Sequence, residues 1–160
     1  MKIRVGFGYD VHQLKAGRPC VLGGVLFDSE VGPDGHSDAD VLLHAICDAI
    51  LGAAGLRDIG FHFPNTDQNF KGADSAGLLH SVMKLIAEKG FKVGNIDATI
   101  VSEKPKISPK IGEMKARVAE LCLINSDDVG VKATTAEKMG FVGREEGIEA
   151  YAVVLLQKVE

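Results

Sequence analysis

The spacing of apolar residues alternates along this chain between the two-residue period of a strand and the three-to-four-residue period of a helix. Strand patterns occur at 3–12, 20–22, 25–27, 93–101, 129–133 and 148–159. Helical spacing predicts one helix from near Ser37 or Asp38 to about Ala53, and two more over about 74–89 and 110–122. This order favours an α+β fold, a two-layer sandwich in which a mixed sheet is packed on one side by helices.

The length of the chain predicts a single domain over residues 1–160 and excludes a multidomain enzyme. A chain of this size, 46% hydrophobic, can build a core without disulfides or a structural metal. We therefore expect Cys20, Cys47 and Cys122 to be reduced and to serve in packing.

The charge balance and the N-terminus narrow the class of protein further. Lysine plus arginine number 18 and aspartate plus glutamate 22, and a net charge of −4 argues against a nucleic-acid partner. No apolar run is long enough to span a membrane, so no membrane partner is expected. The first residues lack the features of a signal peptide, and we expect a bacterial cytoplasmic protein.

The clearest chemical signal is Asp10-Val11-His12 on the first predicted strand. Residues i and i+2 of a strand point to the same side, which puts a carboxylate and an imidazole within reach of one metal ion. Adding His44 gives three protein ligands and an open fourth position, the pattern of a catalytic zinc. The plainer alternatives are a hydrogen-bonded Asp–His pair and a solvated histidine on a helix surface.

His44 has an acidic residue one helical turn away on each side, Asp40 and Asp48. A carboxylate that accepts a hydrogen bond from one imidazole nitrogen leaves the other nitrogen free for a metal. The spacing therefore predicts that Asp40 and Asp48 orient His44.

Two polar stretches could bind phosphate. In His36-Ser37-Asp38, Ser37 or Asp38 suits a helix N-cap, whereas His36 could donate to an anion. In the stretch from Thr134 to Arg144, hydroxyls and a carboxylate fit either a capping box or a site for a diphosphate with a divalent cation. His62 and His80 have no such companions and are expected to be structural or exposed.

Taken together, these stretches resemble the 2-C-methyl-D-erythritol 2,4-cyclodiphosphate synthase family of the non-mevalonate isoprenoid pathway. The matching motifs run in order along almost the whole chain: Gly8-Tyr9-Asp10-Val11-His12, His36-Ser37-Asp38-Ala39-Asp40-Val41-Leu42-Leu43-His44-Ala45, Asp58-Ile59-Gly60, Phe63-Pro64-Asn65-Thr66-Asp67, Phe70-Lys71-Gly72-Ala73-Asp74-Ser75, Gly94-Asn95-Ile96-Asp97, Val131-Lys132-Ala133-Thr134-Thr135, Glu137-Lys138 and Gly140-Phe141-Val142-Gly143-Arg144.

The resemblance implies a lyase that converts 4-diphosphocytidyl-2-C-methyl-D-erythritol 2-phosphate to the cyclic 2,4-diphosphate and CMP. The 2-phosphate of the substrate attacks its own β-phosphorus, so the enzyme needs to position and neutralise two phosphates rather than supply a nucleophile.

The resemblance also implies roles for individual residues. Asp10, His12 and His44 would hold one zinc per subunit, Glu137 a Mg²⁺ or Mn²⁺ on the substrate diphosphate, and His36 and Thr135 would stabilise the transition state. Substrate contacts are expected from Asp10, His12, His36, Ser37, Asp58, Gly60, Phe63, Asn65, Thr66, Asp67, Ser102, Lys106, Ser108, Thr134, Thr135, Glu137, Phe141 and Arg144.

Finally, the resemblance implies a homotrimer with active sites at the subunit interfaces, and Phe141 and Arg144 near a central cavity that accepts an isoprenoid diphosphate. Asn65 departs from the family, which often has Asp there, and this puts a role for that carboxylate in doubt. Two other readings remain open: a metal enzyme in which zinc-bound water attacks a phosphate ester, and a trimeric regulator that binds a small ligand without chemistry.

Overall fold

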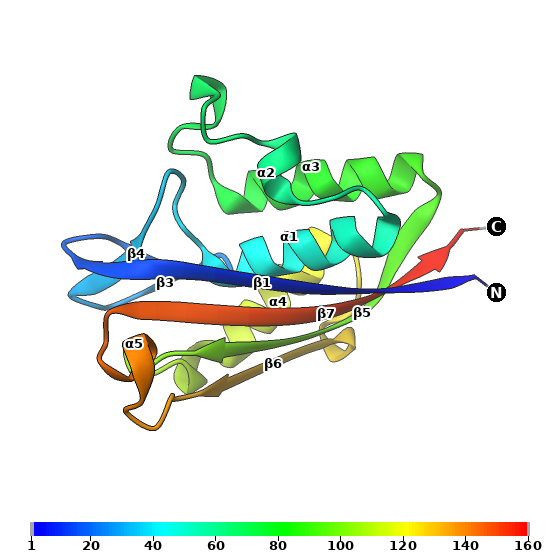
Figure 1. Cartoon of the computed structure of the whole chain (residues 1–160). Helices are drawn as coiled ribbons and strands as arrows, with labels where there is room; N and C mark the ends of the chain where they lie inside the picture. The colour runs from blue at the N-terminus through cyan, green and yellow to red at the C-terminus, as the bar shows by residue number, and fades with distance from the viewer. Residues whose placement is uncertain (1, 160) are drawn as a thin grey trace.

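The computed structural model describes residues 2–159, and its centre is a five-stranded sheet in the order β4-β1-β7-β5-β6 (Figure 1). The strands are β1 (Ile3–Ala16), β4 (Val31–Asp34), β5 (Phe91–Val101), β6 (Val129–Thr134) and β7 (Gly147–Lys158). Neighbouring strands are antiparallel except β5 and β6, which are parallel. The prediction of an α+β fold with a mixed sheet is confirmed.

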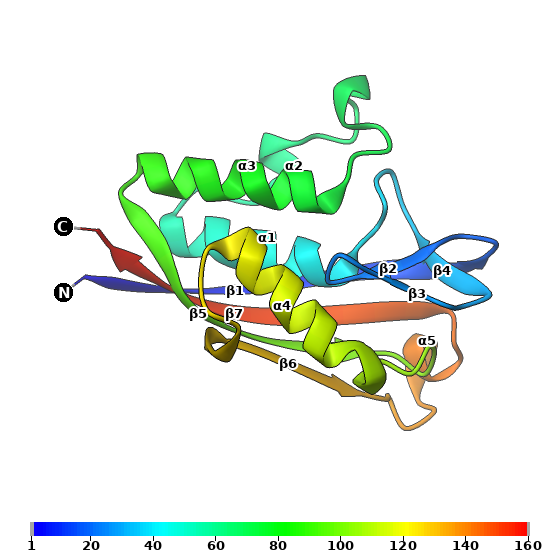
Figure 2. The same ribbon diagram turned by 180° about the vertical axis from the view of Figure 1, so that it is seen from behind.

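Three helices pack against this sheet: α1 (Val41–Ala54), α3 (Ser75–Glu88) and α4 (Ile111–Cys122). Figure 2 shows α4 crossing in front of the strands, on the side of the sheet where α1 and α3 also lie. Two single-turn helices, α2 (Ile59–His62) and α5 (Gly140–Gly143), lie in connections. Among residues 2–159, no helix has the length and apolar character needed to cross a membrane.

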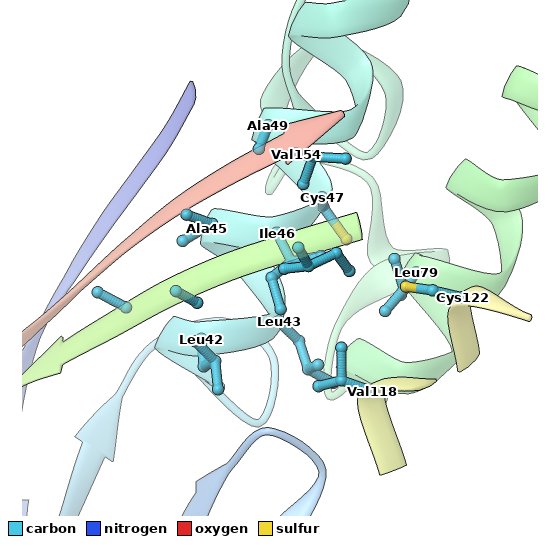
Figure 3. Packing of buried hydrophobic residues seen from close by; sticks show 14 of the residues in the cluster. Leu42, Leu43, Ala45, Ile46, Cys47, Ala49, Leu79, Val118, Cys122 and Val154 are labelled. Carbon is cyan, nitrogen blue, oxygen red and sulfur yellow. The ribbon is translucent and has the colours of Figure 1, made fainter. Parts of the chain in front are cut away.

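The core lies between the sheet and the helices, and α1 contributes more buried residues to it than any other element (Figure 3). Leu42, Leu43 and Ile46 are fully buried. Cys47 on α1 and Cys122 at the end of α4 are buried free thiols, as is Cys20. The prediction that the cysteines serve in packing is confirmed.

Helix α1 lies unusually close to β1 because two residues of that strand have no side chain. A Cβ added to Gly6 would lie 1.9 Å from the carbonyl oxygen of Ala49, and one added to Gly8 would lie 1.9 Å from that of Ala45. Any side chain at either position would push the helix away from the strand. The two glycines therefore set the distance between β1 and α1.

The predicted hairpin is confirmed as β2 (Cys20–Leu22) and β3 (Val25–Phe27). Gly23 and Gly24 between them have φ values of 60° and 72°, the left-handed backbone that a tight two-residue hairpin turn requires.

The start of the first helix differs from the prediction. Helix α1 begins at Val41 with Asp40 as N-cap, not at Ser37 or Asp38. Ala39 has a φ of 55°, and this left-handed residue turns the chain just before the helix can begin. The sequence patterns also did not predict β4, which contains Gly32 and Pro33, or α2 in the connection 57–73.

Over β1 and β7, the face of the sheet away from the helices exposes a group of apolar side chains. Val5 and Phe7 on β1 are 65% and 63% exposed. Ile3, Tyr9 and Val11 lie on the same face of β1 as Val5 and Phe7, opposite to Gly6 and Gly8. Tyr151 and Val153 of β7 continue this surface. We call these seven residues the apolar sheet face.

Candidate metal and substrate site

Asp10, His12 and His44 meet at one point, as the sequence predicts. The carboxylate Oδ2 of Asp10 lies 2.9 Å from Nε2 of His12 and 3.1 Å from Nδ1 of His44, and the two histidine nitrogens lie 3.3 Å apart. Asp10 and His12 point to the same side of β1, and the close approach of α1 brings His44 over them.

Each of the two histidines uses its ring N–H in a hydrogen bond that points away from the other ligands. In the neutral rings, the nitrogens that face Asp10 therefore carry no proton. His12 Nδ1–H donates to the carbonyl oxygen of Asp34 at 3.0 Å, so its Nε2 presents a lone pair. His44 Nε2–H donates to the hydroxyl of Ser75 at 2.8 Å, so its Nδ1 also presents a lone pair. Two lone pairs and a carboxylate that face one another require a cation between them.

The donor set and its dimensions fit a tetrahedral metal ion. Two ligands bound at about 2.0 Å with tetrahedral angles lie about 3.3 Å apart. The three distances of 2.9, 3.1 and 3.3 Å are close to that value. One carboxylate and two imidazoles leave one position of the tetrahedron open toward the pocket described below.

When no metal is bound, protons on the facing nitrogens of His12 and His44 supply this positive charge instead, as two pKa shifts show. Burial alone would lower the pKa of His12, but its hydrogen bond to Asp10 and the charge of Asp10 raise it overall. Burial alone would raise the pKa of Asp10, but hydrogen bonds from His12 and His44 lower it overall.

Ser75 is a member of the site that the sequence reasoning missed. Its buried hydroxyl accepts from His44 and donates to the Asp38 carboxylate, which also accepts from the backbone N–H of Ser75 at 3.1 Å. Ser37 also lies within 3.3 Å of His44 Nε2. The family motif contains both Asp38 and Ser75, but their contact joins residues 37 apart and no spacing rule indicates it.

The prediction that Asp40 orients His44 is not what the structure shows. The Asp40 carboxylate accepts from the backbone N–H groups of Gly23 at 2.9 Å, Gly24 at 2.7 Å and Leu43 at 3.1 Å. Burial raises the pKa of Asp40 to about 6. Asp40 therefore ties the start of α1 to the β2–β3 hairpin, because a helix N-cap side chain turns back to the free amides of its own first turn.

Asp48 likewise contacts backbone rather than His44. Its carboxylate accepts from the N–H of Ile59 at 2.8 Å and so fixes the start of α2. Burial raises the pKa of Asp48. The support of His44 comes from Ser75 and Ser37 instead.

A pocket of about 360 Å³ opens beside the metal ligands. It is lined by eight of the predicted residues, namely Asp10, His12, His36, Ser37, His44, Gly60, Phe63 and Asn65. Gly35, Ile59, Phe70 and Leu78, which were not predicted, complete the lining. Nε2 of His36 is buried there and has no hydrogen-bond partner among residues 2–159, so it is available to a ligand.

Three predicted residues border this pocket without lining it. Asp58 caps α2 by accepting from the N–H of Phe61, and Asp67 caps the single turn Gln68–Phe70 by accepting from the N–H of Asn69. Thr66 is exposed in the same connection.

The remaining predicted residues form a second group, and none of them lines this pocket. Ser102, Lys106 and Ser108 follow β5, and Thr134, Thr135, Glu137, Phe141 and Arg144 lie between the end of β6 and β7. Phe141 borders a different hollow, with Val11, His12 and Gln13. Arg144 forms an ion pair with Glu146.

The capping-box reading of the Thr134 segment is wrong. The first helix after β6 is α5, which begins at Gly140. Thr135 Oγ1 accepts from the N–H of Glu137 at 3.2 Å, and Glu137 and Lys138 have φ values of 52° and 61°. The segment 134–138 is a tight left-handed turn that presents Thr134, Thr135 and Glu137 to the outside.

Histidines without companions behave as expected. Nε2–H of His62 donates to the carbonyl oxygen of Leu56 at 2.7 Å, and His80 is exposed on α3.

Comparison with known proteins identifies the family. The sequence model of the YgbB family matches residues 3–157. A 2-C-methyl-D-erythritol 2,4-cyclodiphosphate synthase of Phocaeicola vulgatus is 62% identical over 160 residues, which covers 100% of both chains. Among solved structures, the bifunctional IspDF from Campylobacter jejuni has a TM-score of 0.95 at 41% identity, and the match covers 99% of this chain and 43% of that one.

A second solved structure is the CDP complex of IspF from Plasmodium falciparum, which has a TM-score of 0.87 at 35% identity. The match covers 99% of this chain and 97% of that one. The resemblance seen in the sequence is thus confirmed over the full length. The chain belongs to the YgbB family, the family of the 2-C-methyl-D-erythritol 2,4-cyclodiphosphate synthases.

Proposed function

We propose that this protein converts 4-diphosphocytidyl-2-C-methyl-D-erythritol 2-phosphate to 2-C-methyl-D-erythritol 2,4-cyclodiphosphate and CMP, in the synthesis of isoprenoid precursors. An oxygen of the 2-phosphate forms a bond to the β-phosphorus. The bond from that phosphorus to the bridging oxygen breaks, and CMP leaves with the electron pair. The observation that carries the proposal is the convergence of Asp10, His12 and His44 beside a pocket that contains an unpartnered His36.

We assign a zinc ion to Asp10, His12 and His44, one per subunit. When bound, it supplies a Lewis acid that polarises a phosphate oxygen. The support is the donor triangle described above, which holds two imidazoles and one carboxylate at tetrahedral separations. Glu137 is exposed, and its carboxylate suits a Mg²⁺ or Mn²⁺ ion carried by the substrate diphosphate.

The side chains of the pocket position the erythritol phosphate. Ser37 and the unpartnered Nε2 of His36 are donors for phosphate oxygens, and donation by His36 stabilises the charge that develops during attack. The wall formed by Gly60, Phe63 and Asn65 holds the carbon chain, and Asp58, Thr66 and Asp67 border it. The neutral Asn65 keeps hydrogen bonding without adding charge repulsion toward the anionic substrate.

The second group completes the site from another subunit. Ser102, Lys106 and Ser108 contact the cytidine, while Thr134 and Thr135 contact the diphosphate, and Thr135 takes part in transition-state stabilisation. The support is that, within residues 2–159, no member of this group lines the pocket beside the metal ligands, and that the residues of the apolar sheet face are exposed together. A homotrimer that buries this face brings the two groups together.

A central cavity of that trimer would contain Phe141 and Arg144 and suits an isoprenoid diphosphate, with an apolar tail and a charged head. The side-chain chemistry of the two residues supports this assignment. The cytoplasmic location expected from the sequence stays a prediction.

The test is incubation of zinc-loaded protein with the cytidylyl substrate, with mass detection of CMP and the cyclic diphosphate. Stoichiometric formation of both products supports the cyclase. Release of inorganic phosphate from simple esters identifies a zinc hydrolase instead. Substrate binding without any product, unchanged in Asp10→Ala and His44→Ala, identifies a ligand-binding regulator.

A further inference from the structure

We propose that Glu103 is a positioning residue for the reaction, because its carboxylate holds the turn that carries Thr135 and Glu137. The inference rests on the proposed function, which places those two side chains at the diphosphate. Glu103 itself is half-buried in the segment after β5 and belongs to none of the groups assigned above.

One carboxylate oxygen makes both contacts. Oε1 of Glu103 accepts from the backbone N–H of Ala136 at 3.0 Å and from that of Lys138 at 3.3 Å. Glu137, which lies between the two donors, and the second donor Lys138 have φ values of 52° and 61°. A turn of this kind aims its amides at one point and forms a concave site for an anion, which Glu103 occupies from within the protein.

The turn needs such a partner because its backbone is strained. The left-handed region is unfavourable for residues other than glycine, and here two such residues follow one another. The surrounding contacts must offset that cost, and the two bonds to Glu103 join an anion to amides that would otherwise donate only to water.

Neighbouring contacts fix the position of the segment that carries Glu103. Its buried neighbour Ser102 donates its N–H to the carbonyl oxygen of Thr134 at 3.0 Å and its hydroxyl to that of Lys104 at 2.6 Å. On the far side of the turn, Gly143 packs so closely that an added Cβ would lie 2.1 Å from the carbonyl carbon of Lys138. The turn is therefore held between two fixed segments.

Within the turn, Thr135 and Glu137 form one unit. The N–H of Glu137 donates to Thr135 Oγ1 at 3.2 Å, so a shift of the backbone at residue 136 moves both side chains. Glu103 thus links the segment assigned to cytidine with the pair assigned to the diphosphate and its second cation. A displacement of the order of 1 Å at reacting groups is enough to cost about 100-fold in rate.

The experiment compares Glu103→Ala, Glu103→Gln and the matched control Glu113→Gln, an exposed carboxylate on the first turn of α4. Full-length zinc-loaded protein is assayed for CMP formation over a range of substrate and Mn²⁺ concentrations. Amide exchange at Ala136 and Lys138 and the zinc content are measured on the same samples.

We expect Glu103→Ala to lower kcat about 10- to 100-fold and to raise the Mn²⁺ concentration for half-maximal rate, with zinc content unchanged. The amides of Ala136 and Lys138 should exchange faster. Glu103→Gln keeps an acceptor oxygen and should fall between Glu103→Ala and wild type, and Glu113→Gln should match wild type.

Faster amide exchange in Glu103→Ala with wild-type kcat and Mn²⁺ dependence would overturn the positioning role and leave a structural one. Unchanged amide exchange would show that Glu103 does not hold the turn. Wild-type protein that forms neither product would refute the proposed function, whereas the exchange measurement would still report on the contact.

Discussion

Gly8 of β1 and Ala45 of α1 are packed so closely that no side chain fits between strand and helix at this level. Ala45 follows directly on the metal ligand His44, and Gly8 lies two residues before Asp10. The absence of a side chain at Gly8 therefore sets the distance between the two backbone segments that carry these ligands.

Gly8→Ala should push α1 away from β1 and weaken both the fold and the metal site. We expect a loss of about 3 kcal/mol or more in the free energy of unfolding, measured by denaturant titration. Gly52→Ala on the same helix is the control, since a Cβ there meets nothing within 4 Å and should stabilise by about 0.5–1 kcal/mol. Equal stability of the two variants would contradict this account of the packing.

Ser75→Ala should weaken metal binding about 10-fold while the fold is retained, because the hydroxyl fixes the ring of His44 through Nε2. Competition with a chromophoric chelator measures the zinc affinity. Ser81→Ala is the control on the same helix, since its hydroxyl donates only to the carbonyl oxygen of Gly77. Zinc affinity equal to wild type in Ser75→Ala would show that His44 needs no such support.

Asp40→Ala should destabilise the protein by about 2–4 kcal/mol, because three backbone N–H groups lose their acceptor. The wild-type protein carries a pH signature of the same group. Burial raises the pKa of Asp40 from 3.8 to about 6, so the folded state binds a proton that the unfolded state releases. Stability from this group is complete below about pH 4 and is lost as the pH rises toward about 6.

Asp40→Asn removes the titratable carboxyl group. The difference in stability between wild type and this variant therefore reports the titration of Asp40 alone. The free energy of unfolding of wild type minus that of Asp40→Asn should fall between pH 4 and pH 6 and then level off. A difference that rises over this range would mean that the three amides lower the pKa of Asp40 more strongly than burial raises it.

His12→Ala should lose bound zinc and turnover together, whereas His36→Ala should keep zinc and lose rate by about 100-fold or more. The reason is that His12 is one of the three converging donors and His36 only lines the pocket. Metal content by mass spectrometry and CMP release test both variants. Zinc loss in His36→Ala would mean that the role of this histidine is misassigned.

Phe7→Asp should convert a trimer to monomers, because it places a charge on the apolar sheet face. Sedimentation equilibrium gives the mass directly. Leu26→Asp, at a position 62% exposed on β3, is the control and should leave the mass unchanged. A trimeric Phe7→Asp, or a monomeric wild type, would argue against assembly through this face.

The sequence patterns predicted the parts of the fold that depend on local spacing. Period two put Asp10 and His12 on one side of a strand, and glycine chemistry predicted the turn at Gly23 and Gly24. Spacing predicted the wrong partner where another contact of the folded structure competes for the same side chain. Asp40 stands one turn from His44, yet the capping geometry directs it to backbone amides.

The other features that the sequence patterns did not predict also depend on the folded structure rather than on local spacing. The contact of Ser75 with His44 links two helices and leaves no trace in periodicity. The strand β4 contains Gly32 and Pro33, residues that argue against a strand, and forms because β1 offers it a partner. The left-handed Ala39 that delays α1 is a conformation that residue type does not indicate.

The positions of the site residues along the chain also limit when the metal site can form during synthesis. Asp10 and His44 are 34 residues apart, and the serine that orients His44 comes 31 residues later on another helix. A nascent chain therefore cannot assemble the complete site until residue 75 has left the ribosome and α3 has docked. Metal capture with His44 fully oriented therefore follows the docking of α3 and cannot precede it.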